Sequence, residues 1–214
     1  VYEYSDRQVS RRNNEKADRV ESLRGNIHKL RAQYKKDLSA SDERLQRTAL
    51  AVALIDETYE RVGNDGSAKE GHFGVTGWQA KHVSFSGGKA TIKYVGKSGV
   101  SQSKTVEPGP VATALKKVLK GKSGDECLFS TEDCKVTSKD VNEYLKDFGV
   151  TAKDLRGFHA NITMCETLNR IRGAGPELPK DKKDRDELLK KEFDKALKET
   201  SDAVGHEADP PRNQ

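Results

Sequence analysis

Residues 81–106 read KHVSFSGGKATIKYVGKSGVSQSKTV and contain three short β-prone segments. These segments, rich in β-branched and aromatic residues, span 81–86, 89–95 and 100–106. Gly87-Gly88 separates the first two, and a Gly-Lys-Ser-Gly loop at 96–99 separates the second from the third. Glycines at these points favour tight hairpin turns. The stretch therefore predicts a small three-stranded antiparallel sheet.

Helical patterns lie on both sides of this sheet along the chain. Apolar residues at three- and four-residue spacing predict helices over 15–37, 42–61, 111–120, 138–147, 158–172 and 180–203. The second is apolar almost all round (TALAVALID, 48–56), so we expect a core helix with Ser41 as its N-cap and VGNDG at 62–66 as its stop signal. The fold class is therefore α+β, mostly helical with one small antiparallel sheet.

The last predicted helix is highly charged. Its apolar residues form a narrow stripe that we expect to face the protein body, namely Leu188, Leu189, Phe193 and Leu197. Gly173, Gly175, Pro176 and Pro179 separate this helix from the preceding one.

Composition restricts the class of protein. Among the 214 residues, 33% are hydrophobic and 34% are charged, and the net charge is +5. Three cysteines without a close pair argue against a disulfide framework, and no apolar run is long enough to span a bilayer. We therefore expect a soluble, intracellular, globular protein, whose mild basicity suggests a polyanionic partner.

The basic surplus is concentrated near the N-terminus. Residues 1–47 carry 12 basic and 8 acidic side chains, with a cluster at Arg7, Arg11, Arg12, Lys16 and Arg19. Such a run is either a solvated helix face or a surface that follows nucleic-acid phosphates, and composition alone leaves both interpretations open.

Common catalytic signatures are incomplete in this chain. GKS occurs at 96–98 and 121–123 without the upstream glycine of a phosphate-binding loop, and the same segments do not complete a G-x-S-x-G nucleophile motif. His206-Glu207 lacks the second histidine of a zinc protease, and no cysteine–histidine set has zinc spacing. Nucleotide hydrolases, serine hydrolases and zinc enzymes are therefore disfavoured.

Five basic residues occupy notable positions. Arg61 ends the predicted core helix, Lys97 lies at a hairpin tip, and His206 follows the charged helix in a V-G-H segment. Lys153 and Arg156 are three residues apart in KDLR and share one side of a turn. Each of the five, taken singly, is an ordinary surface or structural residue.

Several segments in order resemble the catalytic domain of type IB DNA topoisomerases of eukaryotes and large DNA viruses. They are YEYSDRQVSRRNNEKADR (2–19), ALIDETYERVGND (53–65), HFGVTGWQAKHV (72–83), IKYVGKSGV (92–100), VTAKDLRGFHANIT (150–163) and AVGHEADPPRNQ (203–214). The resemblance implies the tyrosine recombinase/type IB topoisomerase fold. It also implies that residues 1–214 form one catalytic domain, divided into a basic segment and helix (1–40), a core (41–175), a linker-like charged helix (176–204) and a histidine segment (205–214).

The resemblance also implies roles for individual residues. The family's catalytic positions fall on Arg61, Lys97, Arg156 and His206, and Lys153 matches a lysine implicated in proton transfer. The matched N-terminal segment implies DNA contacts from a group of four residues, Tyr2, Tyr4, Arg11 and Arg12. The implied partner is double-stranded DNA, bound by a monomer without a small-molecule cofactor, a metal or a membrane.

The family nucleophile is a tyrosine, which the resemblance puts at position 215, one residue beyond Gln214. We therefore expect a fragment that ends just before the tyrosine and that lacks the family's N-terminal domain before Val1. Two alternatives stay open. A tyrosine recombinase or integrase uses the same chemistry, although it usually carries H-x-x-R where this chain has K-x-x-R, and a non-catalytic DNA-binding module needs no tyrosine.

Overall fold

The computed structural model describes residues 5–205, with the side chains of Asp6, Arg7, Val9 and Arg12 outside the description. The chain divides into two compact units, Val1–Phe158 and His159–Gln214, and the boundary between them falls within one helix. Three of the predicted site residues, His206, Tyr2 and Tyr4, lie outside the described residues.

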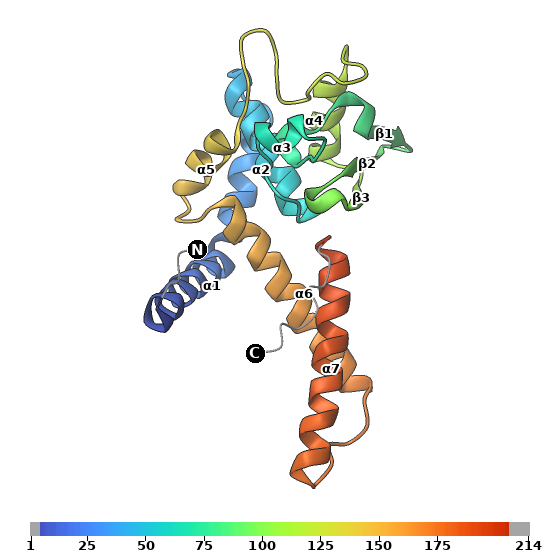
Figure 1. The fold of residues 1–214 in the computed structure, drawn as a ribbon. Helices are drawn as coiled ribbons and strands as arrows, with labels where there is room; N and C mark the ends of the chain where they lie inside the picture. The colour runs from blue at the N-terminus through green and yellow to red at the C-terminus, as the bar shows by residue number, and fades with distance from the viewer. Residues whose placement is uncertain (1–4, 206–214) are drawn as a thin grey trace. The chain divides into compact units, whose positions relative to one another are not determined.

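The first unit combines helices with one sheet (Figure 1). Its helices are α1 (Asp6–Asp37), α2 (Glu43–Thr58), α3 (Asp65–Lys69), α4 (Pro110–Leu119), α5 (Ser138–Lys146) and the start of α6 (Ala152–Ala174). Its short 3-10 helices are η1 (Val75–Gly77), η2 (Ala80–His82) and η3 (Lys97–Gly99), and its strands are β1 (Val83–Ser86), β2 (Lys89–Val95) and β3 (Ser101–Val106).

The predicted sheet is confirmed. The strands pair antiparallel in the order β1-β2-β3, with Ile92 opposite Val83 on one side and opposite Lys104 on the other. Ala90, Ile92 and Tyr94 on β2 alternate with more exposed residues, which is the period of a sheet with one buried face. The strand pairing fixes the positions of the two hairpin turns, and Lys97 lies in the turn between β2 and β3.

Helix α2 forms the centre of the first unit, as its apolar sequence predicts. Its residues from Ala49 to Ile55 are all buried, and the helix packs against α1, α4, α5 and β3. A buried acid, Asp56, extends this packing, because its carboxylate accepts from Tyr34 Oη at 2.9 Å and from Arg31 Nε at 2.8 Å. These contacts join α1 to α2.

The ends of several helices differ from the sequence prediction. Helix α1 begins at Asp6 and not at residue 15, because Ser5 and Gln8 form a capping box. The N-cap of α2 is Asp42, not Ser41, since the Asp42 side chain accepts from Leu45 N at 2.7 Å. Helix α2 also ends at Thr58, not at residue 61.

The second unit contains the rest of α6 and the charged helix α7 (Lys182–Ala203). The two helices lie side by side in Figure 1, and Arg172 Nη1 on α6 contacts Glu192 Oε1 on α7 at 2.7 Å. Of the apolar stripe predicted to face the protein body, Leu188 is half-buried, whereas Leu189, Phe193 and Leu197 are 41–50% exposed. The buried residues of α7 are Glu192, Ala196, Thr200 and Ser201. Within residues 5–205, no helix combines the length and apolarity needed to cross a membrane.

Candidate active site

The position of Arg61 is set by an unusual end to α2. Tyr59 adopts a left-handed backbone conformation, with φ 60° and ψ 22°. This conformation is uncommon for residues other than glycine and costs of the order of 1–2 kcal/mol. It ends the helix, and the chain then leads through Glu60 to Arg61.

The segment that begins with Arg61 is bonded to a second segment. Val75 N donates to Arg61 O at 2.9 Å, and Thr76 N donates to Val62 O at 2.8 Å. Gly74 makes this approach possible, because a Cβ there would lie 2.5 Å from Gly63 Cα and 2.7 Å from Arg61 O. The backbone of residues 61 and 62 is therefore fixed to the segment at 74–76.

Lys153 and Arg156 lie on α6, which begins at residue 152 and not at 158 as the sequence pattern predicted. Asn142 on α5 positions the start of α6, since its Oδ1 accepts from Ala152 N at 3.0 Å. Thr151 and Asp154 cap the first turn through a bond of 2.8 Å between Thr151 Oγ1 and Asp154 Oδ2.

The carboxylate of Asp154 ties α6 to α1. Arg19 Nε donates to Asp154 Oδ2 at 3.0 Å, so Asp154 pairs with Arg19 rather than with the neighbouring basic residues of KDLR. Burial acts to raise the pKa of Asp154, but hydrogen bonds from Arg19 and Thr151 outweigh it, and the pKa lies below its ordinary value. Lys153 is exposed, and we find no ion pair between it and any described residue.

The structure brings Arg156 to the end of α2. Arg156 Nε donates to Tyr59 O at 2.7 Å, and Arg61 is two residues beyond that carbonyl. Both arginines are half-buried. Burial, and next the positive charge of Arg61, lowers the pKa of Arg156 from its ordinary value. Since arginine keeps its proton in proteins, the shift means that two cations share a poorly solvated place, which an anion would stabilise.

A buried acid lies beside these arginines. The Glu60 side chain is 3% exposed, and its Oε1 lies 3.3 Å from Lys104 Nζ on β3, whose side chain is 11% exposed. Sequence reasoning missed Glu60 and Lys104, because neither carries a motif and the pairing depends on how α2 and β3 pack. The one available signal was a charged residue directly before Arg61 at the end of an apolar helix.

Tyr94 on β2 also belongs to this cluster. Its pKa is raised, first by burial and then by the negative charge of Glu60, so the phenol stays protonated. Its ring lies against Trp78, with centroids 5.3 Å apart. Tyr94 therefore contributes a packed ring to the site, and its protonated phenol does not act as a nucleophile.

Lys97 lies in the hairpin turn three residues after Tyr94. Gly96 N donates to Val100 O at 2.7 Å and closes the turn, in which Ser98 has a φ of 63°. Lys97 is exposed, and we find no ion pair between it and any described residue. A side chain in this state is available to a ligand outside the protein.

The structure says less about the two α1 arginines predicted to contact DNA, Arg11 and Arg12. Arg11 Nε pairs with Glu15 Oε1 at 2.8 Å on the exposed face of α1, with its side chain 80% exposed. Arg12 lies on α1, but its side chain is outside the description. Among the described residues, no cluster of histidine, cysteine or acidic side chains could hold a metal ion.

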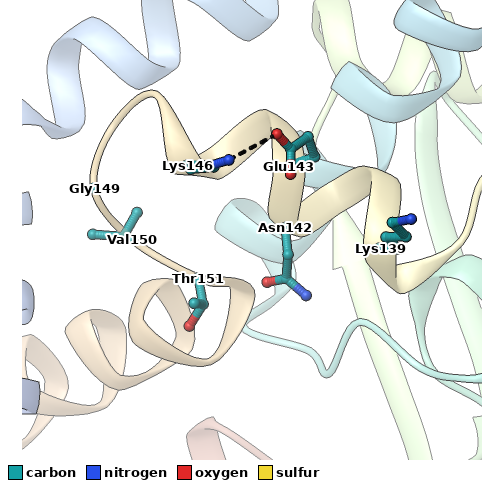
Figure 2. Close-up of a pocket in the computed structure, with 7 residues that line it drawn as sticks. All are labelled: Lys139, Asn142, Glu143, Lys146, Gly149, Val150 and Thr151. Atoms are coloured by element: carbon teal, nitrogen blue, oxygen red, sulfur yellow. Dashed lines mark hydrogen bonds and ion pairs between the residues drawn. The ribbon is translucent and has the colours of Figure 1, made fainter.

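A separate hollow between α5 and the start of α6 does not include any of the predicted site residues (Figure 2). It is lined by Lys139, Asn142, Glu143, Lys146, Gly149, Val150 and Thr151. The candidate active site is therefore not this hollow. It is the arginine cluster, formed by Arg61 and Arg156 with Glu60, Lys104 and Tyr94 beside them.

Comparison with known proteins identifies the family. Residues 5–214 match the family described as "Eukaryotic DNA topoisomerase I, catalytic core". The chain belongs to this family. Its fold, mostly helical with a three-stranded antiparallel sheet, is thus the catalytic-core fold of a type IB topoisomerase, and the family's members are isomerases.

Named relatives agree with this topoisomerase assignment. DNA topoisomerase 1 alpha of Arabidopsis thaliana is 32% identical over 161 residues, covering 73% of this chain and 17% of that protein. DNA topoisomerase I of Monkeypox virus is 31% identical over 173 residues, covering 78% of this chain and 50% of that protein. DNA topoisomerase 1B of Acanthamoeba polyphaga mimivirus is 25% identical over 218 residues, covering 96% of this chain and 63% of that protein.

The topoisomerase-like chain therefore spans only part of each of these relatives. Among solved structures, a post-cleavage complex of the XerH site-specific recombinase with a palindromic difH substrate aligns with a TM-score of 0.49 and 16% identity, covering 92% of this chain and 45% of that one. A similarity of this size carries no argument about function.

Proposed function

We propose that this chain is the DNA-binding and phosphate-binding core of a type IB topoisomerase that relaxes supercoiled duplex DNA. In this reaction one strand is cut transiently through a 3′-phosphotyrosine bond and then rejoined. The observation that carries the proposal is the meeting of Arg61 and Arg156, from two distant segments, beside the carbonyl of Tyr59.

The reaction exchanges one ester for another. A tyrosine oxygen attacks the phosphorus of one strand, the bond between them forms, and the bond from phosphorus to the 5′-oxygen breaks. The tyrosine gives up its proton, and the 5′-oxygen takes one. Religation reverses the same bonds, and because the energy of the phosphodiester is kept in the phosphotyrosine bond, the cycle needs neither ATP nor a metal.

The arginines suit the charge that develops in this step. Arg61 and Arg156 are assigned to the non-bridging oxygens of the phosphate, where guanidinium groups form charge-assisted, bidentate hydrogen bonds. The low solvation of the pair strengthens such bonds in the transition state. His206, whose segment resembles the family's V-G-H element, is assigned the same task.

Lys97 is assigned as the general acid. The leaving 5′-oxygen is a poor leaving group without a proton, and general-acid help is typically worth about 10²–10⁴-fold in rate. Its exposed place at a hairpin tip supports this role, because a hairpin is able to enter a DNA groove. Lys153, on the same helix as Arg156, is assigned to relay the proton.

The nucleophile and the DNA surface complete the proposal. By family resemblance the proposed nucleophile is a tyrosine. Tyr2, Tyr4, Arg11 and Arg12 are proposed to contact the DNA backbone, together with the basic face of α1. The protein acts as a DNA-associated monomer.

The test uses the full-length protein that carries this chain together with its tyrosine. Supercoiled plasmid should be relaxed, and a nicked duplex should give a protein–DNA adduct that survives a denaturing gel. Arg61→Ala should abolish both, whereas duplex binding should remain and weaken steeply with salt through counterion release. If no adduct forms, or if salt leaves the affinity unchanged, the proposal is wrong. Strand exchange between two duplexes by a tetramer would favour a recombinase instead.

A further inference from the structure

We infer that Glu60 is a positioning residue of this active site, whose buried carboxylate keeps Arg61 and Arg156 close enough to bind one phosphate together. The inference rests on the proposed function, since it assigns Glu60 to the same phosphate site. Glu60 does not touch the substrate in this scheme. It acts through the two arginines.

The geometry of Glu60 supports a holding role. Its Oε2 accepts from the backbone N of Arg61 at 3.2 Å, while its Oε1 lies 3.3 Å from Lys104 Nζ. The carboxylate therefore joins the end of α2 to strand β3. Because the side chain is 3% exposed, water provides little of its solvation, and these neighbours must supply it.

Glu60 is also central to the link between the two arginines. The residue before it, Tyr59, supplies the carbonyl that receives Arg156 Nε, and the residue after it is Arg61. Tyr59 is held at φ 60°, a conformation that lasts only where the surroundings enforce it. Burying the Glu60 side chain fixes the direction of the chain at this point, and so fixes both arginine positions.

The charges of Arg61, Arg156 and Glu60 give a second reason to assign Glu60 a positioning role. Two guanidinium groups in a poorly solvated place repel each other, and the charge of Arg61 lowers the pKa of Arg156. Glu60 acts in the opposite direction and raises it. The Glu60 carboxylate thus offsets part of the repulsion between the two arginines, and leaves a net positive charge for an incoming phosphate.

An ordinary structural ion pair with Lys104 is the competing interpretation. A buried ion pair contributes little net stability, and replacing both partners by neutral residues of similar size is often neutral or stabilising. The two interpretations therefore separate in the double variant Glu60→Gln/Lys104→Met. If the pair only supports the fold, this variant recovers whatever either single variant loses.

The first measurement reports the arginines directly and does not need activity. In nitrogen-15 NMR of the full-length protein, the Nε–H of Arg156, bonded to Tyr59 O, should give a resolved signal that exchanges slowly. Glu60→Gln should shift and broaden this signal. The matched control is Asp56→Asn, a buried acid of α2 that pairs with Arg31 and Tyr34. It should leave the Arg156 signal in place, and an unaffected signal in Glu60→Gln overturns the inference.

The second measurement is single-turnover cleavage of a nicked duplex. Glu60→Gln should slow cleavage by up to about 10²-fold, the loss typical of a misplacement near 1 Å, while DNA affinity stays the same or increases because a negative charge is removed. Glu60→Asp, which keeps the charge, should regain part of the rate. The double variant should unfold at the wild-type temperature or above it and still cleave slowly.

The results of these measurements test the role of Glu60 separately from the proposed function. Cleavage as fast as wild type in Glu60→Gln, or full recovery of the rate in the double variant, overturns it. If the wild-type protein forms no adduct, the proposed function fails. The NMR comparison then still decides whether Glu60 holds the arginines.

Discussion

Arg156 and Tyr59 are 97 residues apart in sequence, and the Nε–H of Arg156 donates to the carbonyl of Tyr59 at 2.7 Å. This one bond fixes the guanidinium group of α6 to the end of α2. Because the bond uses Nε, it sets the direction of the planar guanidinium group. The bond therefore orients the arginine as well as locating it.

Arg156→Lys should slow cleavage by about 10²–10³-fold, as when one preorganised donor is removed from an anion-binding site. Lysine keeps the positive charge but has neither the Nε donor nor the planar fork, so duplex affinity should change little. Single-turnover cleavage and DNA titration give the two numbers. Arg31→Lys is the control, because Arg31 also makes a two-point contact, with Asp56. If both variants cleave equally fast, the orientation of Arg156 is unimportant.

Lys97→Ala should slow cleavage far more than it weakens DNA binding, because a general acid acts only while the 5′-oxygen leaves. Replacing that bridging oxygen by sulfur should restore much of the rate, since a thiolate leaves without a proton. The same substrate should not rescue Arg61→Ala. Single-turnover cleavage of both substrates by both variants tests this. Equal rescue of the two variants, or none, would remove the general-acid role from Lys97.

Gly74→Ala should destabilise the protein by about 1–3 kcal/mol, the usual cost of overpacking. The added Cβ would lie 2.5 Å from Gly63 Cα, and backbone cannot rotate out of the way. Cleavage should slow as well, because the displaced segment holds Arg61. Gly25→Ala is the control: nothing lies within 4 Å of its Cβ position in α1, and it should be neutral or stabilising. Urea unfolding of both variants gives the comparison.

Tyr59→Asn should be tolerated better than Tyr59→Val. Both variants lose the phenol ring, but asparagine accepts the left-handed conformation, whereas a β-branched residue resists it. The difference in the free energy of unfolding should be about 1–2 kcal/mol, the cost of the left-handed backbone. Thermal unfolding of the pair measures it. Equal stability would show that the backbone strain at residue 59 is small.

Stability should fall in acid through the Arg19–Asp154 pair. The pKa of Asp154 is lower in the folded protein than its ordinary value of about 3.9, so the stabilisation is present above about pH 4 and is lost as pH falls further. Asp154→Asn should therefore flatten this part of the stability curve. Asp18→Asn, which changes an exposed acid on α1, should not. Melting temperatures from pH 2.5 to 7 test the prediction, and parallel curves for wild type and Asp154→Asn would contradict it.

The sheet could be predicted because its signals are local. Glycines mark both turns, and alternation along 89–95 matches the buried face that includes Ile92 and Tyr94. The core of α2 was predictable for the same reason. The end of α2 was not, because a tyrosine in the left-handed conformation has no sequence signature, and the surrounding packing imposes it.

The site was only partly predictable. Family resemblance selected Arg61 and Arg156, and the structure adds how they meet. Glu60 and Lys104 were missed because the pairing of a buried acid with a buried lysine depends on strand β3 lying against the end of α2. Burial of charge is a property of the tertiary structure, and no local pattern reports it.

The contacts of the two arginines have a consequence for the order of folding. The segment at Arg61 is held by residues 74–76, a short loop that closes quickly, whereas Arg156 reaches Tyr59 only after a loop of 97 residues closes. We therefore expect Arg61 to be held before Arg156 is available to join it. The anion site becomes complete in one late step, so an incompletely folded chain has no paired cations with which to hold nucleic acid.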